Sequence, residues 1–314
     1  MRHFAGVGAC YLDTILCVSH YPSEDEKLRA RSISTRRGGN CPNTLEVLGD
    51  LLQYVGAPIT LDLIAVLPSR QSSATQKIKE SFGSRVSLRK CLFRDEHHEP
   101  PSSYIIRSDA TDSRTIINYN DLPEMTCDEF FRTADALSAA NTWYHFEGRI
   151  PHITLQCMQY LRRSHAGTCI SVELEKPARD GLQELVPEAD VVFYSKSWAE
   201  GNGYHSAAEC LQAQAKLAPN ALLLCCTWGQ QGAYALEPRT DAYSGTVAFH
   251  PEGSRVIDTI GAGDTFIAGI LYTFLQGHKT WSLTERLTFA NQLAGFKVVQ
   301  EGFSGLADRM HLQP

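Results

Sequence analysis

Nine residues near the C-terminal end of the chain, Asp258 to Phe266, combine residue types that phosphoryl transfer needs. Two glycines, Gly261 and Gly263, leave the backbone bare enough for an anion to approach it. The apolar run 265–272 predicts a buried helix, and a helix N-terminus binds phosphate through unpaired N–H groups and its dipole. Asp264 would place a carboxylate beside this turn, where it could take a proton from an attacking hydroxyl. The same residues are typical of an ordinary helix cap, so the motif alone leaves both interpretations open.

A second polar cluster, Arg37 to Asn43 (Arg-Gly-Gly-Asn-Cys-Pro-Asn), precedes a run with helical periodicity. Asn40 and Asn43 lie three residues apart, so both amides can point at one spot. An amide both donates and accepts hydrogen bonds, which suits sugar hydroxyls. Asp13 follows the first predicted strand, at the carboxyl end where open α/β sheets bind ligands. Taken alone, the cluster fits a helix cap as well as it fits a site.

Composition narrows the class of protein. The 314 residues are 43% hydrophobic and 20% charged, which is enough for a sizeable core, and the net charge is −6. No basic tract with interleaved aromatic residues occurs, so we expect no nucleic-acid partner. The ten cysteines include no Cys-x-x-Cys, and several lie in apolar runs, which predicts buried, reduced thiols. There is no signal-peptide pattern and no apolar run of about 20 residues, so we expect a cytoplasmic protein without membrane attachment.

The sequence lacks the motifs of three other kinds of binding site. No Gly-Lys-Ser/Thr occurs, which excludes an ordinary P-loop. The pair Gly6-x-Gly8 lacks the third glycine of a dinucleotide-binding fingerprint. The run 97–99 (His-His-Glu) has no partner at metal-ligand spacing, and the sequence predicts no metal site.

Short apolar runs alternate with helical patterns, which predicts a mostly parallel sheet covered by helices on both faces. Pro42 and Pro151 are predicted as first helical residues, and Ser282 with Glu285 forms a potential capping box. Two further segments, 13–37 and 103–120, read as strands and hairpins and predict a small β-rich lid that would exclude water from a reactive phosphate. The strands of the main sheet are predicted at 3–10, 60–67, 142–146, 168–174, 190–195 and 221–227.

In this order, and with a lid between them, the two clusters resemble those of the ribokinase-like (PfkB) carbohydrate kinase family, and the resemblance covers nearly the whole chain. Its most specific marks are Asp258 to Phe266 and Gly38-Gly39-Asn40. The resemblance implies the α/β class, a ribokinase-like three-layer α/β/α fold with a mostly parallel central sheet and a small β-sheet lid. It implies a single kinase domain, 1–314, with lid segments at about 13–37 and 103–120. The implied activity is ATP-dependent phosphorylation of a primary sugar hydroxyl, with Mg²⁺ carried by the nucleotide and with room for K⁺.

Local loops narrow the resemblance to the ketohexokinase branch of the family. They imply conversion of D-fructose to fructose 1-phosphate by a homodimer that assembles through its lids. Two alternatives stay open: a sibling kinase that acts on ribose, adenosine or another sugar, and a non-catalytic sugar or nucleotide sensor. The loops that carry the narrower match are 21–25, 113–116, 145–149, 172–177, 190–196 and 302–305.

The family's functional residues can be carried over to matching positions of this sequence. Asp264 would be the catalytic base, and the N–H groups of Gly261, Ala262 and Gly263 would form the anion hole. The implied sugar contacts are Asp13, Gly39, Asn40 and Asn43, together with the partner subunit's Asp25, which would reach across from its lid. The implied nucleotide contacts are Arg114, Lys196, Trp228, Gly229, Gly232 and Gly263. Lys196 is equally compatible with a solvated loop charge, and Glu147, Arg149 and Glu173 are compatible with an ion-pair network between strand ends.

Two departures from the family pattern concern the nucleotide side. Ser195-Lys196-Ser197-Trp198 stands where many members carry Asn-x-x-Glu, a motif linked to magnesium and phosphate binding. The resemblance therefore does not imply a magnesium ion bound directly by protein atoms. Gln230 and Gln231 stand where the ketohexokinase pattern is acidic, so we expect an altered rim of the nucleotide pocket with catalysis retained.

Overall fold

The computed structural model describes residues 3–111, 113–137, 141–276, 280–310 and 312. Its centre is an eight-stranded sheet in the order β14-β13-β12-β11-β10-β9-β1-β4. Six neighbouring strands run parallel, and a final antiparallel hairpin, β13 (Ala233–Glu237) and β14 (Ala242–Thr246), forms one edge. The parallel strands are β1 (His3–Val7), β4 (Thr60–Ile64), β9 (Thr142–Glu147), β10 (Cys169–Leu174), β11 (Val191–Tyr194) and β12 (Leu223–Thr227).

Five of the six parallel strands lie within a predicted strand segment, and β9 runs one residue past its predicted end, to Glu147. The run predicted at 60–67 is divided in the structure, because β4 ends at Ile64. A separate strand, β5 (Val66–Pro68), continues the chain and pairs with β6 (Leu92–Arg94) in a two-stranded sheet of its own. The edge hairpin was not predicted from the sequence.

Helices cover both faces of the sheet. Successive strand residues point to opposite sides, so each face of the sheet has its own apolar side chains to bury. Phe4 and Trp143 belong to one core cluster, and their neighbours Ala5 and Tyr144 belong to the other. The predicted three-layer α/β/α fold is therefore confirmed. The first cluster includes α1 (Asn40–Tyr54), α2 (Ser73–Phe82), α7 (Ala262–Leu275), α8 (Leu283–Val298) and α9 (Leu306–Arg309). The second includes α3 (Cys127–Asp135), α4 (Pro151–Ser164), η1 (Leu182–Glu188), α5 (Lys196–Gly201) and α6 (Ala207–Ala215).

The helix starts follow known capping chemistry. Pro151 is the first residue of α4, as predicted, and Ser282 and Glu285 form a complete capping box at the start of α8. The prediction that Pro42 begins its helix is wrong, because α1 begins two residues earlier, at Asn40. A proline is tolerated there because backbone N–H groups in the first helical turn have no intrahelical partner.

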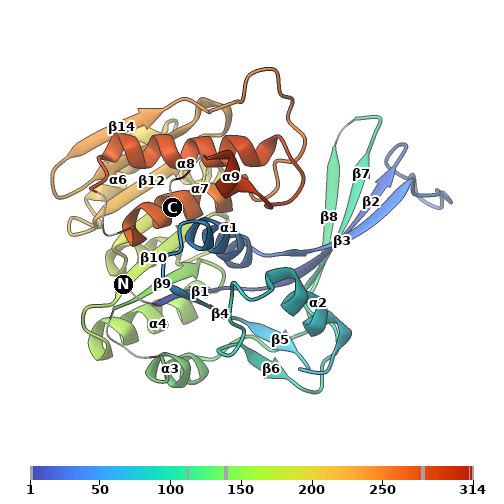
Figure 1. The fold of residues 1–314 in the computed structure, drawn as a ribbon, viewed down its shortest axis with the longest axis horizontal. Helices are drawn as coiled ribbons and strands as arrows, with labels where there is room; N and C mark the ends of the chain where they lie inside the picture. The colour runs from blue at the N-terminus through green and yellow to red at the C-terminus, as the bar shows by residue number, and fades with distance from the viewer. Residues whose placement is uncertain (1–2, 112, 138–140, 277–279, 311, 313–314) are drawn as a thin grey trace.

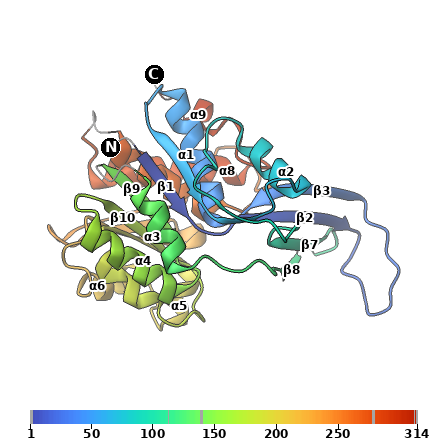
Figure 2. The same cartoon turned by 90° about the horizontal axis from the view of Figure 1, so that it is seen from below.

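A second, four-stranded sheet projects from one side of the body (Figures 1 and 2). We call it the lid. Its strands, in the order β3-β2-β7-β8, are β2 (Tyr11–Val18), β3 (Ser32–Gly38), β7 (Ser102–Ser108) and β8 (Arg114–Tyr119). The strand β2 follows β1 almost directly, and β3 leads straight into α1. The lid is therefore joined to the carboxyl end of the central sheet and to the start of α1.

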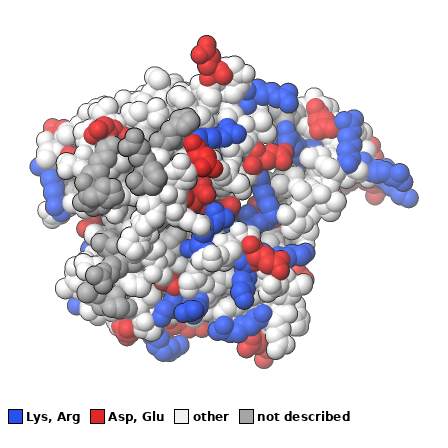
Figure 3. Space-filling model, in the orientation of Figure 1, with Lys and Arg blue, Asp and Glu red and all other residues white. Residues whose placement is uncertain are grey.

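Positive and negative side chains are interspersed on the face of the molecule shown in Figure 3. This distribution agrees with a modest net charge of −6. None of the helices in the described ranges is long and apolar enough to cross a bilayer.

Candidate active site

A cavity of about 490 Å³ lies between the lid and the carboxyl ends of the parallel strands. This is the edge at which open α/β sheets bind ligands. Its lining includes lid residues, the start of α1 and the ends of β11 and β12. The structure brings together here eight residues that the sequence singled out: Asp13, Gly39, Asn40, Asn43, Arg114, Gly261, Gly263 and Asp264.

Asp264 lies in the first turn of α7, where it is buried next to the cavity. Its Oδ2 accepts a hydrogen bond of 2.7 Å from Asn43 Nδ2. Burial raises the pKa of Asp264 to about 7, and the nearby carboxylates Glu175 and Glu147 act in the same direction, against the Asn43 hydrogen bond and Arg37. A carboxylate with a pKa near neutrality is suited to accept a proton from a hydroxyl.

The amide of Asn43 is held in one orientation. Arg37 Nη1 donates to Asn43 Oδ1 at 3.1 Å, and another nitrogen of the same guanidinium donates to Glu46. The Arg37 side chain is almost fully buried, and it lies over the ring of Phe82 with its central carbon 4.4 Å from the ring centre. Arg37 therefore turns the amide nitrogen of Asn43 toward Asp264. The sequence placed Arg37 in the motif without giving it a role, since nothing in its spacing indicates this contact.

The glycine turn before α7 is shaped by Gly261. Its φ is +78°, and a Cβ at this position would lie 2.4 Å from the ring of Phe303. Gly263, two residues later, has no atom within 4 Å of the place where a Cβ would stand, and it lines the cavity. The backbone at Gly263 is thus exposed to any anion that binds at the start of the helix.

Asp258 fixes the same turn through its hydrogen bonds and ion pairs. Its Oδ1 accepts from the backbone N–H of Ile260 at 2.9 Å, and its Oδ2 is paired with Arg36 at 2.9 Å and with Lys297 at 3.0 Å. The Lys297 side chain is 0% exposed. Burial acts to raise the pKa of Asp258, but the Ile260 N–H, Lys297 and Arg36 together hold it below its ordinary value. A buried charge with this set of partners indicates a fixed turn.

The cavity is also lined by carboxylates and amides from other elements. Asp13 extends from β2, and burial raises the pKa of its carboxyl against the opposing effects of a Ser103 hydrogen bond and Arg36. Asn40 Nδ2 lies 3.2 Å from Glu173 Oε2 and 3.0 Å from Glu175 Oε2. These groups can bind hydroxyls because each offers lone pairs or N–H groups at the cavity wall.

The sequence left open an ion-pair network among Glu147, Arg149 and Glu173, and the structure gives these residues other partners. Arg149 pairs with Glu124 and donates to the hydroxyl of Tyr11. Glu147 instead accepts the backbone N–H of Ala9 at 3.0 Å, and Glu173 is bonded by Asn40.

The remaining predicted residues lie outside the cavity lining. Lys196 is 45% exposed, 3.5 Å from Glu200, and its Nζ lies 5.7 Å from the centre of the Trp228 ring. Gly229 begins η2 (Gly229–Gln231), which closes a tight turn, and a Cβ on Gly232 would stand 1.9 Å from the carbonyl oxygen of Thr246. Chain geometry alone therefore explains Gly232. Ala262 is the first residue of α7. Asp25 is exposed in the loop between β2 and β3, with φ +60°.

Comparisons with known proteins agree with this arrangement. A model of the pfkB family of carbohydrate kinases matches residues 1–308. Mouse ketohexokinase is 32% identical over an alignment that covers 96% of this chain and 97% of that protein. An Arabidopsis thaliana ribokinase solved with ribose and ATP superposes with a TM-score of 0.77 at 17% identity, over 100% of both chains. A Methanocaldococcus jannaschii nucleoside kinase of the ribokinase family superposes with a TM-score of 0.72 at 18% identity, over 99% of this chain and 97% of the other.

Proposed function

Because this chain belongs to the pfkB family of carbohydrate kinases, we propose that it transfers the γ-phosphoryl group of ATP to a primary hydroxyl of D-fructose, giving fructose 1-phosphate. The choice of fructose rests on the 32% identity to mouse ketohexokinase. The observation that carries the proposal is the position of Asp264, a buried carboxylate at a helix N-terminus that shares one cavity with Asp13 and Asn40.

In this mechanism the sugar hydroxyl gives its proton to Asp264 as its oxygen bonds to the γ-phosphorus, and the bond from that phosphorus to the bridging oxygen of ATP breaks. We place the transferred phosphoryl group at the backbone N–H groups of residues 261–263, which would stabilise the charge it gains. The N–H of Ala262, which now donates to the carbonyl oxygen of Thr259 at 3.3 Å, would exchange that partner for the phosphoryl group. Arg114 lines the cavity from the lid and supplies a positive charge to the same region. Asn43 and Arg37 hold Asp264 in position.

Kinases of this family use ATP, and the start of α7 fits a phosphate group, since the backbone at Gly263 faces open space. Mg²⁺ would travel with the nucleotide and offset the charge of the phosphates. Glu175 fits the outer shell of such an ion, because its carboxylate lines the cavity and is 36% exposed. Magnesium commonly keeps several waters and is held through only one or two carboxylates.

The sugar end of the cavity favours a neutral polyol. Asp13, Asn40 and Asn43 are anionic or uncharged, whereas a sugar phosphate requires cationic partners at the acceptor site. ADP release should be measured with fructose, ribose, adenosine and fructose 6-phosphate. We expect the highest kcat/KM with fructose. A preference for ribose or adenosine would overturn the choice of sugar, and no turnover on any of the four would overturn the kinase proposal.

We also propose a homodimer in which the lids pack together. One face of the lid carries Asp13, Ser103 and Arg114 and lines the cavity. The strand register places exposed apolar side chains on the opposite face: Ile33, Tyr104, Ile117 and Tyr119, which are 68%, 48%, 56% and 50% exposed. An exposed apolar patch of this kind commonly marks a protein interface. Sedimentation analysis of the wild type and of Ile33→Ser/Ile117→Ser tests this, because the double variant should be monomeric.

A further inference from the structure

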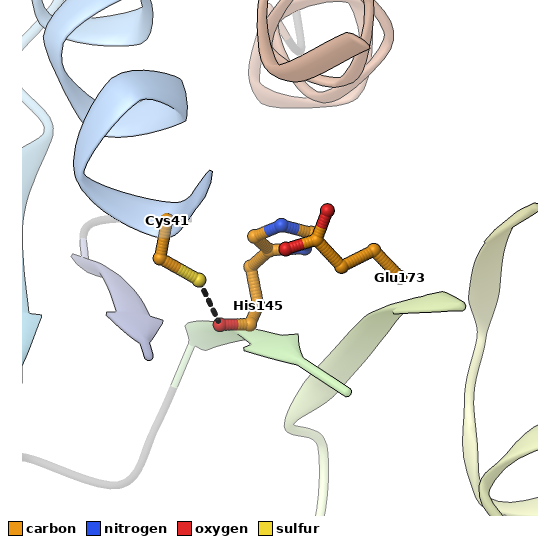
Figure 4. A group of neighbouring side chains, drawn as sticks. All are labelled: Cys41, His145 and Glu173. Carbon is orange, nitrogen blue, oxygen red and sulfur yellow. Dashed lines mark hydrogen bonds between the residues drawn. The ribbon is translucent and has the colours of Figure 1, made fainter. Parts of the chain in front are cut away.

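Three potential metal ligands converge in the core next to the cavity (Figure 4). Cys41 comes from α1, His145 from β9 and Glu173 from β10. One ligand atom from each residue lies within 4.8 Å of the other two, and all three residues are buried. Their separation along the sequence gave no local spacing from which a metal site could be predicted.

Two polar atoms of this cluster lack partners. His145 Nε2 and Glu173 Oε1 are both buried without a hydrogen bond. His145 is 0% exposed and Glu173 is 5% exposed. Polar atoms buried in this way lose free energy unless something binds them, so most native structures satisfy them. Because both atoms belong to one cluster, a single ion could satisfy both.

The environment of His145 suits a metal ligand. Its Nδ1 lies 2.9 Å from Ser171 Oγ, which also accepts a hydrogen bond of 2.8 Å from Trp143 Nε1. A hydroxyl oxygen has two lone pairs, so Ser171 can accept from His145 Nδ1–H as well. That tautomer leaves a lone pair on Nε2. A hydrogen bond at the second ring nitrogen is the usual way in which a metal-binding histidine is oriented.

The cluster lies against Gly8 and reaches the cavity through Glu173. A Cβ on Gly8 would lie 3.0 Å from Cys41 Sγ, so a larger residue there would crowd the sulfur. Cys41 Sγ now donates to the carbonyl oxygens of Val7 at 3.3 Å and His145 at 3.7 Å, contacts that a thiol gives up when it loses its proton. Glu173 also lines the cavity, which gives an ion a path to the cluster.

We propose that Cys41, His145 and Glu173 bind one divalent transition-metal ion, and that Zn²⁺ fits best, with a fourth position open toward the cavity. One thiolate, one imidazole and one carboxylate are ligands that zinc accepts, usually with tetrahedral geometry. Mg²⁺ and Ca²⁺ prefer oxygen ligands only, so the sulfur argues against them. Glu173 also accepts a hydrogen bond from Asn40, which links the ion to the proposed sugar site. The proposal is independent of the sugar that the enzyme phosphorylates.

Cobalt(II) provides a direct test, because its thiolate complexes absorb in the near ultraviolet and its tetrahedral complexes absorb in the visible. The full chain, freed of metal with a chelator and kept reduced with a phosphine, is titrated with Co²⁺. We expect one equivalent to produce both absorptions and one equivalent of Zn²⁺ to remove them. Cys41→Ala should lose the thiolate absorption. Ser171→Ala should bind Co²⁺ roughly 10–100-fold more weakly, because it removes the hydrogen bond that orients the His145 ring.

Cys91→Ala is the matched control. Cys91 is also buried, and its Sγ donates to the carbonyl oxygen of Leu63 at 3.2 Å, much as Cys41 does to Val7. This variant should keep the full cobalt spectrum. If Cys41→Ala does not fold by circular dichroism, Glu173→Gln replaces it and should weaken Co²⁺ binding. A wild type without a one-equivalent thiolate absorption, or an unchanged spectrum in Cys41→Ala or Glu173→Gln, would overturn the proposal.

Discussion

Asn43 Nδ2 donates a 2.7 Å hydrogen bond to Asp264 Oδ2, and this contact joins the start of α1 to the start of α7. The two residues are 221 positions apart in the sequence. On its other side, Asn43 accepts from the buried guanidinium of Arg37. The proposed base is therefore positioned by a chain of two side chains, both from the N-terminal polar cluster.

Replacing Asp264 with asparagine tests its role as the base. Asp264→Asn keeps the shape of the side chain but removes its ability to take a proton. We expect kcat to fall by on the order of 10²–10⁴, the usual contribution of general acid–base catalysis, with little change in sugar KM. Steady-state kinetics measure this, with the exposed Asp241→Asn as control. Turnover near the wild-type rate would show that Asp264 is not the base.

The pH dependence of the reaction should report the same carboxyl. Its pKa is raised to about 7, and only the deprotonated form can accept a proton, so kcat/KM should rise with pH through a midpoint near 7. The Asn43 hydrogen bond lowers this pKa. Asn43→Ala should therefore move the midpoint to higher pH, whereas Asn220→Ala, at an exposed loop residue, should not. An identical midpoint in all three proteins would contradict the assignment.

Stability should respond to the same group. The folded-state pKa of Asp264, about 7, lies above its ordinary value of 3.8, so the folded protein binds the proton more tightly. This contribution is complete below pH 3.8 and is lost as the pH rises through about 7. Asp264→Asn removes the dependence, so its Tm relative to the wild type should increase between pH 5 and pH 8. Calorimetry at both pH values measures the difference, and a constant difference would contradict the argument.

Much of the fold could be predicted because buried parallel strands read as short apolar runs. The strand β12, for example, is Leu-Leu-Cys-Cys-Thr. The edge strand β14, Ala-Tyr-Ser-Gly-Thr, has no such pattern, because its residues are only partly buried or exposed. The pairing of β2 with β7 in the lid joins residues about 90 positions apart. Local sequence carries no signal for a pairing at that distance.

The candidate site, like the fold, could be predicted only in part. Asp264 and Asn40 could be found because each lies in a short motif at a helix start, and the fold brings both motifs to one cavity. The link from Arg37 through Asn43, and the cluster of Cys41 with His145 and Glu173, depend on side-chain directions that spacing does not encode.

Asp25 can be tested by complementation between subunits. The family resemblance implies that it acts in the partner's site, and its exposed position in the β2–β3 loop, outside the lining of its own chain's cavity, is compatible with that role. Asp25→Asn tolerates the positive φ of this residue, and it should raise sugar KM. Mixed with Asp264→Asn chains, which still carry Asp25, it should regain activity, because one site of each mixed dimer is then complete. Activity equal to the sum of the separate variants would contradict a shared site.

The two glycines of the turn before α7 should respond in opposite ways to the same change. Gly261→Ala forces alanine into a left-handed conformation, which costs roughly 1–2 kcal/mol, and drives its methyl group into Phe303. It should lower Tm. Gly263→Ala meets no atom within 4 Å and lies in the first turn of α7 without a positive φ, so alanine fits there and loses less conformational freedom on folding than glycine does. Its Tm should be equal or higher.

Activity should not follow stability in this pair. The methyl group of Gly263→Ala would occupy the open space in which we place the transferred phosphoryl group, so kcat should fall roughly 10²-fold, the scale of losing one oxyanion-hole donor. Calorimetry and kinetics on the same preparations separate the two effects. A Gly263→Ala enzyme that is stable and fully active would mean that the phosphate does not bind at this turn, because a methyl group in that space would then have left phosphoryl transfer unchanged.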